Sequence, residues 1–417
     1  MDTTEATGTS LLEQPEAVAL LDDAVVTAGQ VEGCRQRLEK FMQRYLPWFY
    51  RKEQRESATI VIQGLLSGLE RKTAEPIARE HGVPRKPIQF FVGAGKWDDE
   101  AVMGKLGRDV VAAMGDPAGV LVLDPSAFAK KGTESCGVAR QWCGRLGKKE
   151  NCQVGVFLAY ATDRGQAPLD RRLYLPKDWS ADKARRTKCH VPGSVRFQES
   201  WRMGLNMIDA HRGQVPHRWV VADDEFGRVQ GFRAGLRKRN EPYVLDVPCS
   251  TAVRDVQGGR QGPGSEDRRR VVPFVRAEAW AAAQPAGRWV KVHVKNGAKG
   301  PITVRAMMTP VRTREDGRVG PAEWLLVLRS IESDGGSPKL SYHVVWAPRE
   351  VTLEEAVVAH GRRHQIEQMF EDAKGQAGLG HYEVRSYVGW HHHMTLSFLA
   401  LWFLCLERLE EGKKLQR

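Results

Sequence analysis

Three acidic residues have the chemistry and the setting of a metal site. Asp124 ends the apolar run Val120–Leu123, and Asp223 ends a second apolar run, Trp219–Ala222. Glu367 lies far along the chain, in a stretch with helical periodicity. Carboxylates at the ends of buried strands, joined by others from distant segments, form the oxygen-rich sites in which magnesium serves phosphate chemistry. The three residues therefore predict a divalent-cation site.

The stretch around Glu367 adds positive charge to the same region. At about 100° per residue, a helix over Leu353–Gln376 places four polar residues on one narrow stripe: His360, Arg363, Glu367 and Lys374. A solvated helix face would also gather polar residues, so the stripe has two interpretations. If the helix lies against a core, Arg363 offers phosphate a bidentate fork and Lys374 offers a point charge.

Composition narrows the partners and the compartment. The 417 residues include 63 Lys and Arg against 51 Asp and Glu, a net charge of +12 that favours a polyanion such as nucleic acid. Seven cysteines without a C-x-x-C pair indicate neither a zinc site nor a disulfide framework, as in a reducing cytoplasm. The longest apolar stretch, Met394–Leu406, is shorter than the ~20 residues of a membrane span. We expect a cytoplasmic protein without a membrane partner.

The chain alternates between helical and strand-like segments. Ala74–Gly82 followed by Pro84 predicts two short helices across a turn, which is either a helix-turn-helix DNA reader or part of a plain helical domain. Two strand-like segments, Cys152–Thr162 and Leu169–Leu175, follow Asp124. Later strand and helix patterns alternate, which favours a mixed sheet with helices on its faces.

From about residue 249 the sequence pattern changes to repeated β-like runs, which predicts an all-β insertion. Four β-like runs carry this prediction: Trp289–Val294, Ile302–Val311, Trp324–Ile331 and Tyr342–Trp346. The expected organisation is a flexible N-terminus (1–28), a helical DNA-binding domain (29–116), a catalytic domain (117–248 and 351–410), the β-rich insertion (249–350) and a C-terminal tail (411–417).

Several segments resemble bacterial insertion-sequence transposases of the DDE superfamily, in particular the insertion sequence 701 branch, which is related to insertion sequence 4-type transposases. The segments are Asp124–Gly132, Val138–Val156, Leu173–Trp179, Trp219–Asp223 with Phe226 and Gly227, Arg363–Lys374 and Gly378–Arg385. The Arg-x3-Glu-x6-Lys pattern of Arg363, Glu367 and Lys374 is the most specific of them. Such proteins often have Asp and Thr where this chain has Pro125 and Ser126, and a tyrosine where it has His360.

The resemblance implies an α/β, RNase H-like catalytic fold with flanking helices, interrupted by the β insertion and preceded by the helical domain. It implies that Asp124, Asp223 and Glu367 are catalytic residues and ligands of two Mg²⁺ ions, with Mn²⁺ as a possible substitute. The implied reaction is nicking at the element's ends followed by attack of the freed 3′-hydroxyl on target DNA.

The implied partners are double-stranded DNA, namely terminal inverted repeats and a target, and a second copy of the chain on the DNA ends, in association with the bacterial nucleoid. Candidate DNA-binding residues are Arg363, Lys374, His360, Lys130 and Lys131. Two alternatives stay open: a metal-dependent nuclease without strand transfer, and a catalytically inactive DNA-binding protein that keeps the fold.

Overall fold

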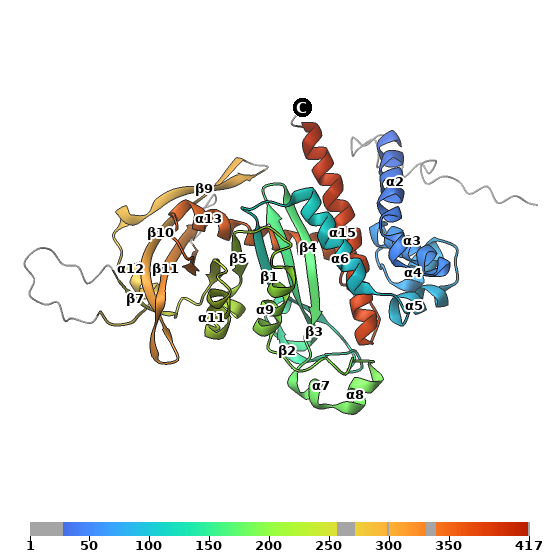
Figure 1. The fold of residues 1–417 in the computed structure, drawn as a ribbon, viewed down its shortest axis with the longest axis horizontal. Coiled ribbons are helices and arrows are strands. Elements are labelled where there is room, and N and C mark those ends of the chain that lie inside the picture. Colours follow the sequence, from blue (N-terminus) through green and yellow to red (C-terminus); the bar gives the residue numbers. More distant parts are fainter. Residues whose placement is uncertain (1–27, 257–271, 298–299, 331–338, 416–417) are drawn as a thin grey trace, which may run out of the picture.

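The computed structural model describes residues 28–256, 272–297, 300–330 and 339–415. Helices near the N-terminus lie at one end, a β-rich region lies at the other, and a mixed sheet with flanking helices lies between them (Figure 1). The expected flexible N-terminus, apart from Ala28, is outside the described residues. Within the described residues, no helix combines the length and apolar character needed to cross a membrane.

The N-terminal part is helical, as predicted. Its helices are α2 (Ala28–Gln43), α3 (Lys52–Leu66), α4 (Ala74–Glu80), α5 (Arg85–Gly93) and α6 (Asp99–Met114). The turn between α4 and α5 uses Gly82 at φ 63°, a backbone region that favours glycine. Asp98 caps α6 by accepting a hydrogen bond from the Ala101 amide, so the side chain satisfies one unpaired donor of the first turn.

The central sheet begins with six strands. They are β1 (Val120–Ala129), β2 (Ala139–Cys143), β3 (Lys148–Thr162), β4 (Gly165–Leu173), β5 (Trp219–Ala222) and β6 (Tyr243–Asp246). β1 pairs antiparallel with β3, which pairs antiparallel with both β2 and β4. On its other side β1 pairs parallel with β5, which pairs parallel with β6. Apolar residues fill the paired part of β1 and all of β5 because helices cover both faces of the sheet.

The same sheet continues into the β-rich region. Its strands are β7 (Ala252–Asp255), β8 (Val275–Arg276), β9 (Val290–Gly297), β10 (Gly300–Glu315), β11 (Arg318–Ser330) and β12 (Leu340–Trp346). The last of them, β12, pairs antiparallel with β6. The four predicted β runs correspond to β9 through β12, but the region also contains a short helix, α12 (Ala277–Ala282), so it is not purely β.

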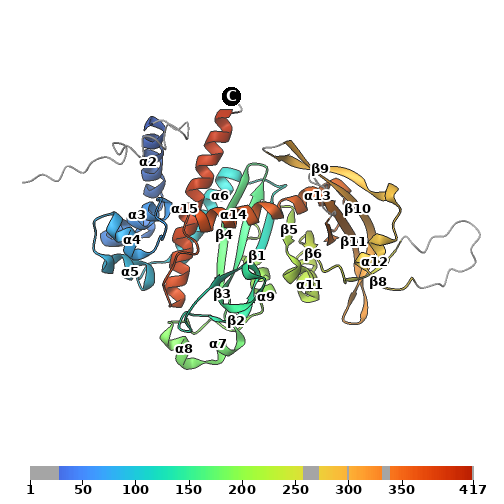
Figure 2. The same ribbon diagram turned by 180° about the vertical axis from the view of Figure 1, so that it is seen from behind.

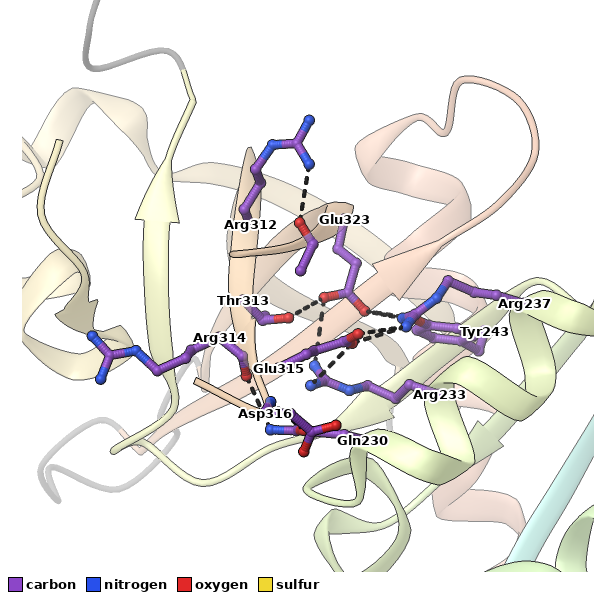
Figure 3. A network of polar contacts seen from close by, with 11 residues as sticks. Gln230, Arg233, Arg237, Tyr243, Arg312, Thr313, Arg314, Glu315, Asp316 and Glu323 are labelled. Carbon is purple, nitrogen blue, oxygen red and sulfur yellow. Dashed lines mark hydrogen bonds and ion pairs between the residues drawn. The ribbon is translucent and has the colours of Figure 1, made fainter. Parts of the chain in front are cut away.

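A buried ionic network links the β-rich region to the helix α11 (Gln230–Lys238) (Figure 3). At its centre, the fully buried Glu323 of β11 accepts a hydrogen bond from Thr313 at 2.7 Å. Glu323 also pairs with Arg233 at 3.4 Å and with Arg237 at 3.2 Å. The network therefore joins β10 and β11 to a helix that flanks the central strands.

The remaining helices are α7 (Lys177–Ala181), α8 (Lys183–Lys188), α9 (Ser200–His211), α10 (Asp224–Gly227), α13 (Leu353–Gly361), α14 (Arg363–Gly375) and α15 (Tyr387–Leu415). They include α9, α14 and α15, which pack on the central strands, and α7 and α8, which lie at one end of the sheet (Figure 1 and Figure 2). Figure 2 shows α14 crossing the sheet on the face opposite α9. The helix α15 continues to Leu415, beyond residue 410, where the catalytic part was expected to end.

The helix predicted over Leu353–Gln376 is interrupted. It is divided into α13 and α14, with Arg362 as the turn between them. A Cβ atom on Gly361 would lie 2.4 Å from Val294 Cγ1, so only glycine permits this close approach to β9. The prediction of one straight helix was therefore wrong at this point.

Candidate active site

Strand register places Asp124 and Asp223 next to each other. In the parallel pair of β1 and β5, Leu123 lies opposite Ala222, and each aspartate is the next residue along its strand. Both side chains are partly buried. The sequence led us to expect that this strand ends at Asp124. Instead, β1 remains paired with β3 through Ala129. What ends at Leu123 is the pairing with β5, and this opens the sheet beside the two carboxylates.

The chain turns from strand to helix at Asp223. The Asp223 carboxylate caps α10 by accepting a hydrogen bond from the Glu225 amide at 3.1 Å. The neighbouring Asp224 is the first residue of that helix and forms an ion pair with Arg228. Because β5 ends at Ala222, the alternation of side chains along a strand does not distinguish Asp223 from Asp224. The structure separates the two residues by their partners instead.

The helix α14 brings Glu367 and Arg363 to the same place. Arg363 Nη1 lies 3.1 Å from Glu367 Oε1, and His364 Nδ1 lies 3.3 Å from Glu367 Oε2. Burial lowers the pKa of Arg363, but surrounding carboxylates outweigh it and raise that pKa above its ordinary value. In order of strength they are Asp246, Asp124, Glu367 and Asp223. One guanidinium thus lies among four acids.

Burial and neighbouring negative charges raise the pKa of both aspartates. Burial, followed by the charge of Asp223, raises the pKa of Asp124 to about 8, although Arg363 lowers it. Burial, followed by the charge of Glu225, raises the pKa of Asp223 to about 7. Arg363 alone does not offset the burial and the neighbouring negative charges of Asp124 and Asp223. Their hard oxygen donors match the ligand preference of Mg²⁺.

Lys374 reaches the same region from the last turn of α14. Its Nζ donates a hydrogen bond to Ser126 Oγ at 2.9 Å, and its charge lowers the pKa of Asp124. The ammonium lies 5.7 Å from the ring centroid of Phe128 and 5.6 Å from that of Phe370. Lys374 is therefore beside the acids, as the predicted stripe required.

His360 lies on the other side of the helix break from Arg363 and Lys374. The break at Arg362 places it on α13, where its Nε2 lies 3.3 Å from Asp246 Oδ1. The predicted helix is interrupted between His360 and Arg363, but both side chains still face Asp246. The structural partners of His360 are Asp246 and His343, whose ring centroid is 4.0 Å away.

The two basic residues after β1 differ in setting. Lys130 is partly buried, with Nζ 3.3 Å from the Tyr382 carbonyl oxygen and 3.3 Å from the centroid of the Tyr382 ring. Burial lowers the pKa of Lys130 to about 8. Lys131 is exposed. Of the two, Lys131 has the surface position that a phosphate contact requires.

Asp246 is a fourth acid that the sequence interpretation missed. It is the last residue of β6, whose Leu245 lies opposite Ala222 of β5, so Asp246 is in line with Asp223. Its Oδ2 lies 3.4 Å from Arg363 Nε. A usable signal was present, because Asp246 ends the apolar run Tyr243–Leu245 in the same way that the other two aspartates end theirs.

Comparison with known proteins agrees with these features. A family described as "DDE superfamily endonuclease" matches residues 44–303, which include Asp124, Asp223 and Asp246 but not Glu367. A protein of Microchaete diplosiphon named "Probable transposase for insertion sequence element IS701" is 28% identical over 217 residues. That similarity covers 50% of this chain and 54% of the relative, so the chain spans about half the length of the curated protein it matches.

Proposed function

This chain belongs to the DDE superfamily of endonucleases, and we propose that it is the DNA transposase of an insertion sequence. The observation that carries the proposal is the meeting of Asp124, Asp223 and Glu367 around Arg363, from two neighbouring strands and a distant helix. The proposed fold of the central part is RNase H-like. Two aspartates on adjacent strands and a glutamate on a late helix support it.

We propose that the three acids hold divalent ions. Membership of the family implies use of a divalent metal, and Mg²⁺, with Mn²⁺ as a substitute, suits the carboxylate oxygens of Asp124, Asp223 and Glu367. When bound, two such ions polarise the scissile phosphate and activate the attacking hydroxyl. The raised pKa values of Asp124 and Asp223 support this assignment, since a bound cation would offset both the burial, which is their largest cause, and the neighbouring negative charges.

The cationic side chains act on the DNA phosphates in this proposal. Arg363 and Lys374 balance the charge of a phosphodiester that enters among the acids, and Arg363 can donate two hydrogen bonds to its oxygens. The oxygen of a water molecule attacks phosphorus, and the 3′-oxygen of the element's end leaves as a hydroxyl. That hydroxyl then attacks a target phosphate and displaces the target's 3′-oxygen. No high-energy cofactor is required, because the first step is the hydrolysis of a phosphodiester and the second exchanges one phosphodiester bond for another.

We propose that the N-terminal helices bind the element's ends. On α5, Lys86 and Gln89 are exposed, and the Phe90 side chain is 64% exposed. The short turn after α4 presents this helix at the surface, as a recognition helix for the major groove requires. A pair of chains on two DNA ends is the assembly that the resemblance implies.

Incubation of the full chain with Mg²⁺, DNA carrying the element's ends and a target plasmid tests the proposal. Joined end–target products are the result expected for a transposase. Cleavage without joining would replace the proposal with a nuclease, and bound but intact DNA would replace it with an inactive DNA-binding protein. The Glu367→Gln variant, which keeps the size of the side chain, serves as the control for contaminating nucleases.

A further inference from the structure

Three aspartates lie at the same level of three parallel neighbouring strands, two of them within β1 and β6 and the third directly after β5. Leu123 of β1 lies opposite Ala222 of β5, which lies opposite Leu245 of β6, and the next residues are Asp124, Asp223 and Asp246. The first two belong to the proposed metal site. Asp246 has different partners, because its two oxygens are already engaged by cationic or hydrogen-bonding side chains.

Two histidines hold one oxygen of Asp246. His343 Nδ1 lies 2.8 Å from Asp246 Oδ1, and His360 Nε2 lies 3.3 Å from the same atom. Burial lowers the pKa of His343 to about 4, so its ring is neutral near pH 7. Its Nδ1–H therefore donates to Asp246, and its Nε2 accepts from the Ser341 hydroxyl at 2.8 Å.

The other oxygen of Asp246 faces Arg363. Asp246 Oδ2 lies 3.4 Å from Arg363 Nε, while Nη1 of the same guanidinium lies 3.1 Å from Glu367. Burial raises the pKa of Asp246, but the hydrogen bonds from His343 and His360, together with the charge of Arg363, bring it well below the ordinary value. Asp246 is thus an ionised carboxylate in a fixed position. Arg363 contacts both Asp246 and Glu367 and so links the two acids.

We propose that Asp246, anchored by His343 and His360, is a positioning residue for Arg363. It sets the place of the guanidinium among the acids, and through that guanidinium it sets the place of Glu367. The inference rests on the proposed function, because it assigns Asp246 to the same reaction without making it a ligand of the ions.

A transition-metal site formed by the same three side chains is the competing interpretation. Ligand atoms of Asp246, His343 and His360 lie within 4.8 Å of one another. Two contacts argue against a cation there. The second ring nitrogen of His343 is already bonded to Ser341, and the guanidinium of Arg363 lies beside the free oxygen of Asp246, where it would repel another positive charge.

A double-mutant cycle between Asp246→Asn and Arg363→Lys tests the proposal. The rate of nicking is measured in single turnovers with saturating DNA and Mg²⁺. We expect Asp246→Asn to slow nicking by about 10–100-fold, as for outer-shell partners of metal sites, with the dissociation constant for DNA unchanged. In the Arg363→Lys background the same substitution should cause little further loss. If Asp246 only stabilised the fold, Asp246→Asn would lower the fraction of active protein equally with arginine or lysine at position 363.

The matched control is Asp209→Asn. Asp209 of α9 also pairs with an arginine, Arg239, at 2.6 Å, but it lies away from the acids. Its substitution should leave nicking unchanged. Wild-type nicking by Asp246→Asn, or losses that add fully in the double variant, would overturn the proposal. So would a stoichiometric transition metal in the purified protein that is lost on His343→Gln.

A second readout separates this inference from the proposed function. The same four proteins are unfolded in denaturant, where residues in contact give non-additive changes. If the wild type nicks no DNA, the proposed function fails, but non-additive unfolding midpoints still support the contact between Asp246 and Arg363. Additive midpoints would overturn the positioning role even in an active enzyme.

Discussion

Asp124 retains its proton at a pH where an ordinary aspartate has lost it. Its folded pKa of about 8 lies above the ordinary 3.8, so between these values the folded state binds more protons than the unfolded state. The contribution of Asp124 to the stability of the metal-free protein must then fall as pH rises from about 4 to about 8. We expect Asp124→Asn to weaken this fall and to unfold at least ~2 °C above the wild type at pH 9 in chelator. Thermal unfolding of both proteins from pH 5 to pH 9 measures the pH dependence and the difference in unfolding temperature.

Asp178→Asn is the control for that experiment, because Asp178 is exposed on α7. Its melting curve should follow the wild type at each pH. A pH dependence of Asp124→Asn identical to that of the wild type would show that Asp124 ionises normally in the folded chain.

The proposed metal ligands make a separate prediction about DNA cleavage. Asp124→Asn, Asp223→Asn and Glu367→Gln each remove one charge while keeping the side-chain size. We expect each to slow cleavage by at least ~10³-fold, because metal-assisted charge stabilisation is lost. Asparagine also caps helices well, so Asp223→Asn should keep α10 in place. Nicking assays with Mg²⁺ measure the loss, and gel shifts should show DNA binding within about twofold of the wild type. Cleavage at the wild-type rate by any of the three would remove that residue from the site.

The sequence could predict those site residues that are part of a local sequence pattern. Asp124 and Asp223 follow apolar runs, and Glu367 falls in a spaced pattern with Arg363 and Lys374. Asp246 follows an equally apolar run, but its partner His343 is 97 residues away along the chain. No local pattern encodes such a contact, which depends on the pairing of β12 with β6. Tertiary ion pairs were therefore the part of the site that the sequence did not disclose.

At the scale of elements, the periodicity of side chains located most strands and helices but not their connections. The four β runs and the helix pair α4 and α5 are present as predicted. The break between α13 and α14 was missed, and the glycine beside it, Gly361, lies against Val294 of β9, which is a contact between elements. The continuation of one sheet from β6 into β12 was hidden for the same reason.

The network around Glu323 tests how strongly α11 is joined to β10 and β11. Glu323→Gln removes the charge that pairs with Arg233 and Arg237, while Thr313 keeps a hydrogen-bond partner. Breaking a buried ion pair typically costs about 3–5 kcal/mol, because the remaining charge stays buried without compensation. We expect a loss of that size in denaturant unfolding.

Glu75→Gln provides the exposed counterpart. Glu75 pairs with Arg85 at 3.1 Å, but both side chains are at least half exposed. A surface pair contributes about 0–1 kcal/mol, so this variant should unfold close to the wild type. Equal losses in the two variants would mean that burial of the Glu323 network adds no stability.

At the scale of the whole molecule, the net charge of +12 is the property that the sequence discloses most directly, since it requires no fold. Binding of a duplex by many lysines and arginines releases counterions, so affinity falls as salt rises. A chain that makes 6–10 phosphate contacts should lose about 10³–10⁵-fold in affinity between 50 and 200 mM salt. Fluorescence anisotropy with labelled duplexes measures this slope.

Comparison of two duplexes then separates charge from recognition. A duplex with the element's end and a scrambled duplex of equal length should show similar salt slopes, because phosphate contacts are independent of sequence. The end-containing duplex should bind more tightly at every salt concentration, because base contacts by the N-terminal helices add to the same electrostatic term. A shallow slope for both duplexes would show that the positive charge serves the folded chain rather than DNA, since ion pairs such as Arg237–Glu323 already use part of it.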